Sequence, residues 1–169
     1  MIKIELAEIT DLDRIMKIIE ACANDLISKK IFQWSKKYPN REVFKDDIKK
    51  NELYVFKHKS EIIGCVVLCS TKDVEYKDVK WLTEDSKNLY IHRLAVDPKF
   101  QKKGVGKSLM DFSEEYAQEN GFKSVRLDTF SQNKRNNKFY KSRQYVQLSD
   151  VFFPMQSEFP FHCYEKIIN

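Results

Sequence analysis

The chain has 169 residues, a length typical of one domain that can bury a hydrophobic core, and we expect a single domain over residues 1–169. Hydrophobic residues make up 42% of the chain and charged residues 33%, a balance that argues against both an intrinsically disordered protein and one embedded in a membrane. The net charge of +5 comes from lysines dispersed along the chain rather than from a basic block, so the composition gives little support to nucleic-acid binding.

The N-terminal part of the chain predicts a strand followed by two helices. Residues 1–6 alternate apolar and charged side chains, as a half-buried strand does, and they lack the apolar run of a secretion signal, so we expect a cytoplasmic protein. Thr10 and Asp13 mark the expected start of the first helix, and Asn40 is expected to cap a second, shorter helix. The first helix carries one apolar stripe, formed by Leu12, Ile15, Ile19, Cys22 and Leu26.

The next segments predict a hairpin followed by an acidic loop. Residues 53–57 and 62–69 are apolar runs joined by a polar turn, which is typical of two antiparallel strands. Residues 70–88 are polar and carry several carboxylates around Trp81, so we expect a loop with at most a short helical turn. The four cysteines lack the paired spacing of a metal site, and we expect reduced thiols in the core and no bound metal.

The middle of the chain combines a strand, a glycine-containing turn and a helix. Residues 90–96 are dense in β-branched, aromatic and aliphatic side chains, and apolar residues recur at helical spacing from Val105 onward. Gly104 and Gly106 allow a tight bend at the start of this helix, where the first amides have no partner within the helix. We therefore expect an anion, most simply a phosphate group, to bind at this turn.

Two common phosphate-binding motifs do not fit the spacing. A P-loop requires its first glycine at position 101, which is Gln101. A dinucleotide-binding fingerprint requires a third glycine at position 109, which is Leu109.

The C-terminal third predicts a strand, a short helix and two final strands. The strand spans residues 125–130, the helix spans residues 133–142, and the last strands are expected at residues 145–148 and 159–168. Three polar side chains of the helix are three and four residues apart and so share one face: Asn133, Asn136 and Tyr140.

These segments together resemble the GNAT superfamily of acetyl-CoA-dependent N-acetyltransferases. Residues 101–106 read Gln-Lys-Lys-Gly-Val-Gly and are similar to the Q/R-x-x-G-x-G/A pyrophosphate loop of that superfamily. The flanking segments at residues 93–98 and 125–129 look like its fourth and fifth strands, and the stretch from Asn133 to Tyr145 follows its N-x-x-A-x-x-F-Y-x-x-x-G-F pattern. Within that stretch Asn136 replaces the usual alanine and Gln144 the usual glycine.

The resemblance implies a fold and a cofactor. The fold is α/β, with a mixed, mostly antiparallel sheet of six to seven strands, about four flanking helices, and two splayed central strands that hold the pantetheine arm of acetyl-CoA. The positions that match the cofactor site of the family are Leu94, Ala95, Val96, Gln101, Lys102, Lys103, Gly104, Val105, Gly106, Lys107, Ser108, Thr129, Asn133, Asn136, Phe139 and Tyr140.

The activity implied by the resemblance is transfer of the acetyl group to a primary amine by direct attack through a tetrahedral intermediate. The main-chain amide of Leu94 is the expected oxyanion donor, and Tyr140 is the expected acid for the leaving thiolate. An alkylamine with a pKa near ~10.4 is about one part in a thousand neutral at pH 7.4, which adds roughly 4 kcal/mol to the barrier, so a base is useful. His92 is the candidate, with Tyr90 relaying through water, and deprotonation through bound water alone stays open.

The acceptor is expected to be a small-molecule or peptide amine. Trp34, Tyr38 and Trp81 either line its site or simply pack onto the core. An alternative function is a non-catalytic module that binds acyl-CoA through the same loop. A homodimer formed through the terminal strands is also possible, because Phe152, Phe153, Phe159 and Phe161 fit an interface as well as a core.

Overall fold

The structure is a computed structural model that describes residues 2–35 and 37–168. The α-helices among these residues are α1 (Leu12–Ser28), α2 (Arg41–Lys49), α3 (Val105–Glu119) and α4 (Lys134–Ser142). The strands are β1 (Ile2–Leu6), β2 (Leu53–His58), β3 (Glu61–Cys69), β4 (Asn88–Val96), β5 (Ser124–Phe130), β6 (Val146–Val151) and β7 (Phe161–Ile167). No helix of the described part is long and apolar enough to cross a membrane.

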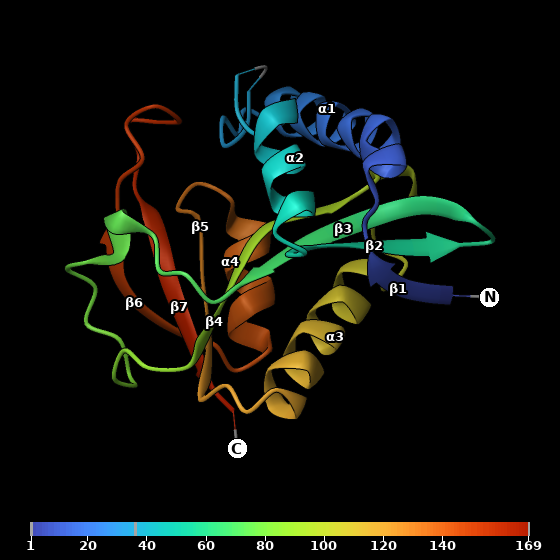
Figure 1. Cartoon of the computed structure of the whole chain (residues 1–169). Helices are drawn as coiled ribbons and strands as arrows, with labels where there is room; N and C mark the ends of the chain where they lie inside the picture. Colours follow the sequence, from blue (N-terminus) through green and yellow to red (C-terminus); the bar gives the residue numbers. More distant parts are fainter. Residues whose placement is uncertain (1, 36, 169) are drawn as a thin grey trace.

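The strands form one sheet in the order β1-β2-β3-β4-β5-β7-β6, in which only the central β4–β5 pair is parallel. Helices α1 and α2 cover one face of the sheet, and α3 and α4 cover the other (Figure 1). Helix α3 connects β4 to its parallel neighbour β5, so the glycine turn before α3 lies at the C-terminal end of β4. The expected mixed, mostly antiparallel α/β fold is confirmed.

Three clusters of buried side chains hold the layers together. One lies between the sheet and helices α3 and α4, and a second lies between the sheet and α1 and α2. The third covers the β5–β7 half of the sheet with aromatic side chains of the long β3–β4 loop, among them the fully buried Tyr76. In Figure 1 this loop lies on the side of the molecule where β6 and β7 end the sheet. The β3–β4 loop is therefore packed against the sheet, although its sequence is polar.

Local sequence signals placed most helix ends correctly. The Asn40 side chain accepts a hydrogen bond from the amide of Val43 at 3.1 Å, as the predicted cap of α2 requires. The start of α1 differs from the prediction: Thr10 lies inside a 3-10 turn, and the Asp11 carboxylate accepts the amide of Glu8 at 2.9 Å instead. Gln144 has φ +68°, so the turn after α4 keeps the left-handed backbone that glycine usually supplies.

The last strands lie slightly differently from the prediction. β6 continues to Val151, and β7 begins only at Phe161. Of the four terminal phenylalanines, Phe161 is buried, whereas Phe152 and Phe159 are exposed. The core thus accounts for Phe161, and the two exposed rings stay available for an interface.

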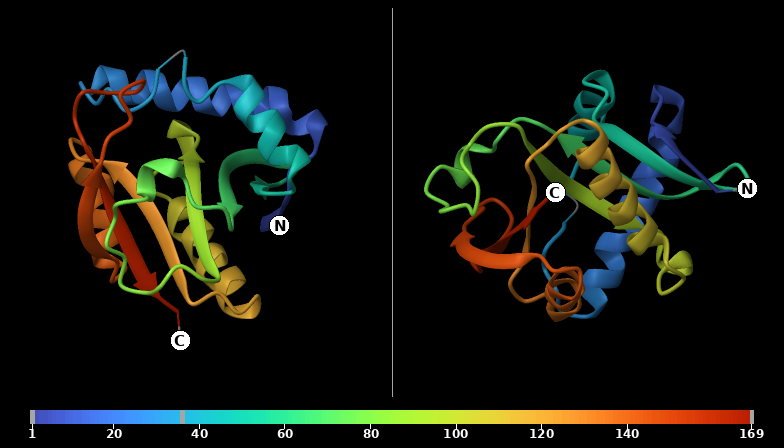
Figure 2. Two further views of the ribbon diagram at one scale, coloured as in Figure 1. Left: turned by 60° about the vertical axis from the view of Figure 1, so that its left-hand side comes forward. Right: turned by 90° about the horizontal axis from the view of Figure 1, so that it is seen from below.

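Two irregularities interrupt the middle of the sheet. The β4–β5 pairing runs from Asn88 with Ser124 to Ile91 with Leu127 and then stops, and the two strands separate beyond that point (Figure 2). On the other side of β4, the β3–β4 pairing shifts register at Arg93 and Leu94, which together oppose one residue of β3. This pattern is a β-bulge, and it leaves main-chain groups of β4 unpaired at the mouth of the separation.

Candidate active site

The glycine turn presents the amides of the first turn of α3. Gly104 has φ +85° and precedes the helix, a left-handed conformation that glycine adopts without strain. The first i to i−4 hydrogen bond of α3 runs from the amide of Ser108 to the carbonyl of Gly104 at 2.9 Å. The amides of Val105, Gly106 and Lys107 therefore have no acceptor within the helix, and the helix dipole makes this end positive.

Gln101 fixes this turn to the end of β4. Its Nε2 donates to the carbonyl of Val96 at 3.2 Å, and its Oε1 accepts from Arg135 of α4 at 2.9 Å. The side chain thus ties the strand, the turn and α4 together at one edge of the central gap.

A pocket of about 530 Å³ extends from this turn along the end of β4. Its walls come from α1, the end of β4, the glycine turn and α4. They include most of the positions predicted for a cofactor, namely Leu94, Ala95, Val96, Gln101, Lys102, Gly104, Gly106, Lys107, Asn133, Asn136, Phe139 and Tyr140. The anion site at the helix start and the unpaired strand edge of β4 therefore belong to one elongated pocket.

The bulge that shapes this strand edge is held by a buried ion pair. Arg93 has φ +49°, and its guanidinium donates to both carboxylate oxygens of Asp47 at 2.6 and 2.9 Å and to the Tyr38 hydroxyl at 3.2 Å. A left-handed conformation is costly for arginine, and the contacts from α2 offset that cost. As a result, Leu94 lies outside the regular β3–β4 pairing, next to the gap.

A second, smaller cavity of about 80 Å³ adjoins the first. The two share Gln33, Trp34, Leu94, Asn136 and Tyr140. The smaller cavity also has walls from Tyr38, Asp73, His92, Asp128 and Thr129. Two compartments thus meet at Leu94 and Tyr140, one reaching the anion site and the other enclosed by polar and aromatic side chains.

Helix α4 positions Tyr140 at this junction. The Asn133 side chain caps the helix by accepting the amide of Asn136 at 3.1 Å, and the Asn136 side chain donates to Thr129 of β5 at 3.4 Å. Tyr140 is 6% exposed, and burial raises the pKa of its hydroxyl, which stays protonated and able to donate a hydrogen bond.

Residues 15–145 match the model of the acetyltransferase (GNAT) family, which is well over half of the chain. The protein belongs to the GNAT acetyltransferase family. It is therefore an acyltransferase that uses acetyl-CoA. No curated protein matches the chain.

Solved structures show the same fold over the whole chain. A GNAT-family acetyltransferase from Streptococcus agalactiae 2603 is 22% identical, with a TM-score of 0.82 over 99% of this chain and 96% of that one. One from Listeria monocytogenes 4b F2365 is 20% identical, with a TM-score of 0.78 over 98% and 94%. The PaiA N-acetyltransferase of Thermoplasma acidophilum, solved in complex with coenzyme A, is 18% identical, with a TM-score of 0.72 over 99% of both chains.

The residues of the larger pocket of this GNAT protein fit acetyl-CoA. Three free amides and a positive helix end suit a pyrophosphate, and an unpaired strand edge suits the amide groups of a pantetheine arm. When bound, acetyl-CoA supplies an activated acetyl thioester. Ser108 does not offer its amide to the phosphates, because that amide already bonds the helix, and the Val105 side chain is buried in the core.

His92 and Asp128 both contribute to the smaller cavity, and burial shifts their pKa values in opposite directions. Burial lowers the pKa of His92 to about 3, and the nearby charge of Arg93 adds to the effect. Burial raises the pKa of Asp128 to about 6, although a hydrogen bond from the Tyr76 hydroxyl acts the other way. At neutral pH, His92 is therefore uncharged and weakly basic, whereas Asp128 is an ionised carboxylate close to its pKa.

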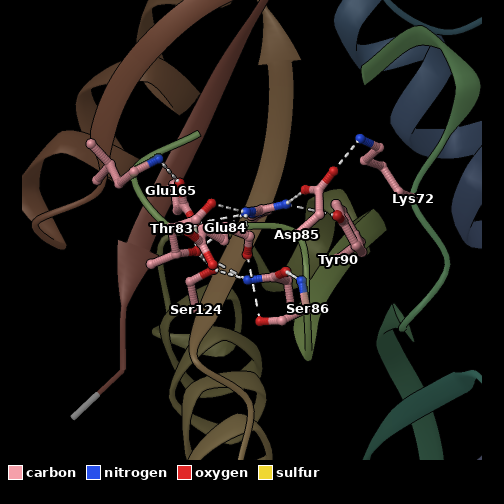
Figure 3. A network of polar contacts seen from close by, with 11 residues as sticks. Lys72, Thr83, Glu84, Asp85, Ser86, Tyr90, Ser124 and Glu165 are labelled. Carbon is pink, nitrogen blue, oxygen red and sulfur yellow. Dashed lines mark hydrogen bonds and ion pairs between the residues drawn. The ribbon is translucent and has the colours of Figure 1, made fainter. Parts of the chain in front are cut away.

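The predicted proton relay Tyr90 and the predicted acceptor contact Trp81 lie outside both cavities, as do three of the predicted cofactor positions, Lys103, Val105 and Ser108. Tyr90 pairs with Arg126 in the β4–β5 ladder, below the point where the strands separate, and its hydroxyl accepts from Arg126 at 2.9 Å (Figure 3). Trp81 packs against the guanidinium of Arg126 at 4.6 Å and against Tyr76. The expectations that Tyr90 relays a proton and that Trp81 touches the acceptor therefore do not fit the observed geometry.

Sequence reasoning missed the two carboxylates of the smaller cavity, Asp128 and Asp73. Asp128 stands inside the predicted fifth strand, and an inward-facing aspartate near a matched motif was the signal that could have identified it. Asp73 lies in the acidic β3–β4 loop, where nothing local distinguishes it from its neighbours. Trp34 and Tyr38, by contrast, contribute to the wall of the smaller cavity, and their contact with the acceptor stays a prediction.

Proposed function

We propose that the protein is an N-acetyltransferase whose acceptor is a primary amine that enters the smaller cavity. The observation that supports this proposal most directly is the meeting of the two cavities at Leu94 and Tyr140. An acetyl group held in the larger cavity and an amine held in the smaller one would face each other at that point. Direct attack then needs no covalent intermediate on the protein.

Each step of the transfer has a candidate group at the junction. The amine nitrogen forms a bond to the acetyl carbon, and the amide of Leu94 donates to the oxygen that gains negative charge. When the carbon–sulfur bond breaks, the Tyr140 hydroxyl donates a hydrogen bond or its proton to the leaving sulfur. A base must take one proton from the attacking amine.

We propose Asp128 as this base, in preference to His92. A general base is most effective when its pKa lies near the working pH, and the pKa of about 6 for Asp128 meets this condition better than that of about 3 for His92. Asp128 accepts a hydrogen bond from the Tyr76 hydroxyl, which fixes the carboxylate beside the cavity.

The rate should depend on the ionisation of Asp128. At saturating amine and acetyl-CoA, kcat is expected to fall as the pH is lowered through about 6, because protonated Asp128 cannot accept a proton. Asp128→Asn should lower kcat by about 100-fold or more and remove this dependence. Tyr76→Phe removes a hydrogen bond that favours the ionised form, so it should move the fall in kcat to higher pH.

The pH profile also distinguishes the alternatives. If His92→Ala abolishes the pH dependence and Asp128→Asn preserves it, the base is His92 and the proposal for Asp128 is incorrect. If both variants preserve it, deprotonation proceeds through water.

Binding of acetyl-CoA should depend on the glycine turn. In calorimetric titration, Gly104→Glu is expected to weaken binding about 100-fold, or ~2.7 kcal/mol, because it places a negative charge beside the phosphate groups. Gly121→Glu is the matched control: Gly121 has φ +69°, so the variant carries similar backbone strain, but it lies at the far end of α3. Equal loss of binding in both variants would show that strain, and not the phosphate site, causes the effect.

A further inference from the structure

The smaller cavity carries negative charge in a protein whose net charge is +5. Its charged residues are Asp73, Asp128 and Arg93, and the charge of Arg93 is already neutralised by the two bonds to Asp47. The two carboxylates of Asp73 and Asp128 therefore make the net charge of the cavity negative. Asp128 stands on β5 and contributes to the wall of the smaller cavity, whereas the Asp73 side chain is 41% exposed and lies toward solvent.

A polar atom beside Asp73 has no partner. The Nε2 atom of His92 is buried and makes no hydrogen bond, and the His92 side chain is only 10% exposed. With the ring proton on Nδ1, this nitrogen is an acceptor without a donor, on a side chain that contributes to the wall of the cavity. A buried acceptor without a donor is costly, so its presence points to a ligand that supplies an N–H group.

His92 Nε2 and Asp73 Oδ2 are 3.9 Å apart. A single ammonium nitrogen can lie about 2.8 Å from both, the usual length of a charge-assisted hydrogen bond. The ring of Tyr76 is stacked on His92, with ring centres 6.3 Å apart, and so holds the imidazole in this orientation. Asp73 and His92 together thus offer two acceptor atoms to one ammonium group.

We propose that the acceptor is an elongated aliphatic amine with a second positive charge, a diamine or polyamine rather than a monoamine or an amino acid. Its reacting nitrogen lies at Asp128 and its second ammonium lies between Asp73 and His92. The aromatic side chains of Trp34, Tyr38 and Phe153, which also face the cavity, suit the methylene chain between the two charges. This inference rests on the proposed acetyl transfer to an amine and adds the chemical class of that amine.

The test compares acceptors of equal length. Steady-state kinetics would be measured with diamines from diaminopropane to diaminohexane. Each diamine is compared with the monoamine of the same chain length and with the amino acid in which a carboxylate replaces the second amine. For the best chain length we expect kcat/KM of the diamine to exceed that of the monoamine at least about tenfold, and that of the amino acid to fall below both. In the Asp73→Asn variant, the ratio of kcat/KM for the diamine to kcat/KM for the monoamine should fall to near one.

Asp78→Asn is the matched control, because it removes the same charge from an exposed position of the same loop and should leave the ratio unchanged. Equal use of diamines and monoamines by the unaltered protein overturns the inference, as does a peptide with a lysine side chain that is used better than every diamine. An equal loss for both acceptor types in Asp73→Asn also overturns it. If acetyl-CoA binds but none of the amines releases coenzyme A, the proposed function itself fails, which is a different result.

Discussion

Replacing Tyr140 with phenylalanine is expected to lower kcat by about 100-fold or more and to leave the KM values for both substrates within about twofold. In the proposed mechanism the hydroxyl acts only when the carbon–sulfur bond breaks, so its loss should affect the transition state and not the bound ground state. Tyr140 contributes to both cavities, and the ring remains in the variant to pack against Phe139, Tyr145 and Tyr164. Initial rates over a range of both substrate concentrations provide the measurement.

Tyr145→Phe provides the matched control for this experiment. Tyr145 is as buried as Tyr140 and packs against it, but it contributes to neither cavity, and its hydroxyl bonds Glu114 at 3.3 Å. We expect its kcat to stay near that of the unaltered protein. If Tyr140→Phe retains full kcat, the leaving sulfur receives its proton from solvent and Tyr140 has only a packing role.

Arg126→Met is expected to destabilise the fold by about 3–5 kcal/mol, the usual cost of leaving a buried charge without its partner. The Arg126 side chain is fully buried, and its partners Thr83, Asp85 and Glu165 are labelled in Figure 3. It donates to Glu165 at 3.0 Å, to Asp85 at 2.7 Å and to the carbonyl of Thr83 at 2.6 Å. Burial raises the pKa of Glu165, but the hydrogen bonds from Ser124, Thr83 and Arg126 outweigh this effect and hold the pKa below its usual value. Glu165 is therefore ionised, and Arg126 is the cation that pairs with its buried charge.

The same substitution should loosen the β3–β4 loop. Arg126 holds the loop at Thr83 and Asp85, and the loop brings Asp73 to the smaller cavity and the Tyr76 hydroxyl to Asp128. Denaturant unfolding measures the stability, and hydrogen exchange of residues 70–87 measures the loop. We expect increased exchange in this loop before global unfolding.

Two further variants separate the buried network from ordinary ion pairs. Arg41→Met removes an exposed pair in which Arg41 and Asp13 are 2.6 Å apart, and it should cost less than about 1 kcal/mol. The double variant Arg126→Met with Glu165→Met should recover part of the lost stability, because the unpaired carboxylate is then absent. A cost for Arg126→Met no larger than that for Arg41→Met would show that the network contributes little to folding.

The helices and strands could be predicted because each depends on local features of the chain. Alternating side chains identified β1, the apolar stripe identified α1, and the side chain of Asn40 capped α2, all through interactions within a few residues. The glycine turn could also be predicted from local sequence, because glycines at the start of a helix allow a tight bend and the first amides of any helix lack partners within it. In the structure Gly104 has a left-handed backbone. The family resemblance then placed Tyr140 and the cofactor positions on this framework.

The acceptor side of the active site depends on contacts between distant segments, and only the tertiary structure determined it. The bulge at Arg93 and Leu94 is held by Asp47 from another helix, and the pKa of Asp128 is raised by its burial in the assembled fold, against the effect of the hydrogen bond from Tyr76. Local sequence carries no signal for such pairings, because burial and charge are properties of the assembled sheet rather than of a residue and its neighbours. For that reason the sequence alone indicated a cofactor, whereas the three-dimensional fold favoured Asp128 over His92 as the proposed base and brought Asp73 to the smaller cavity.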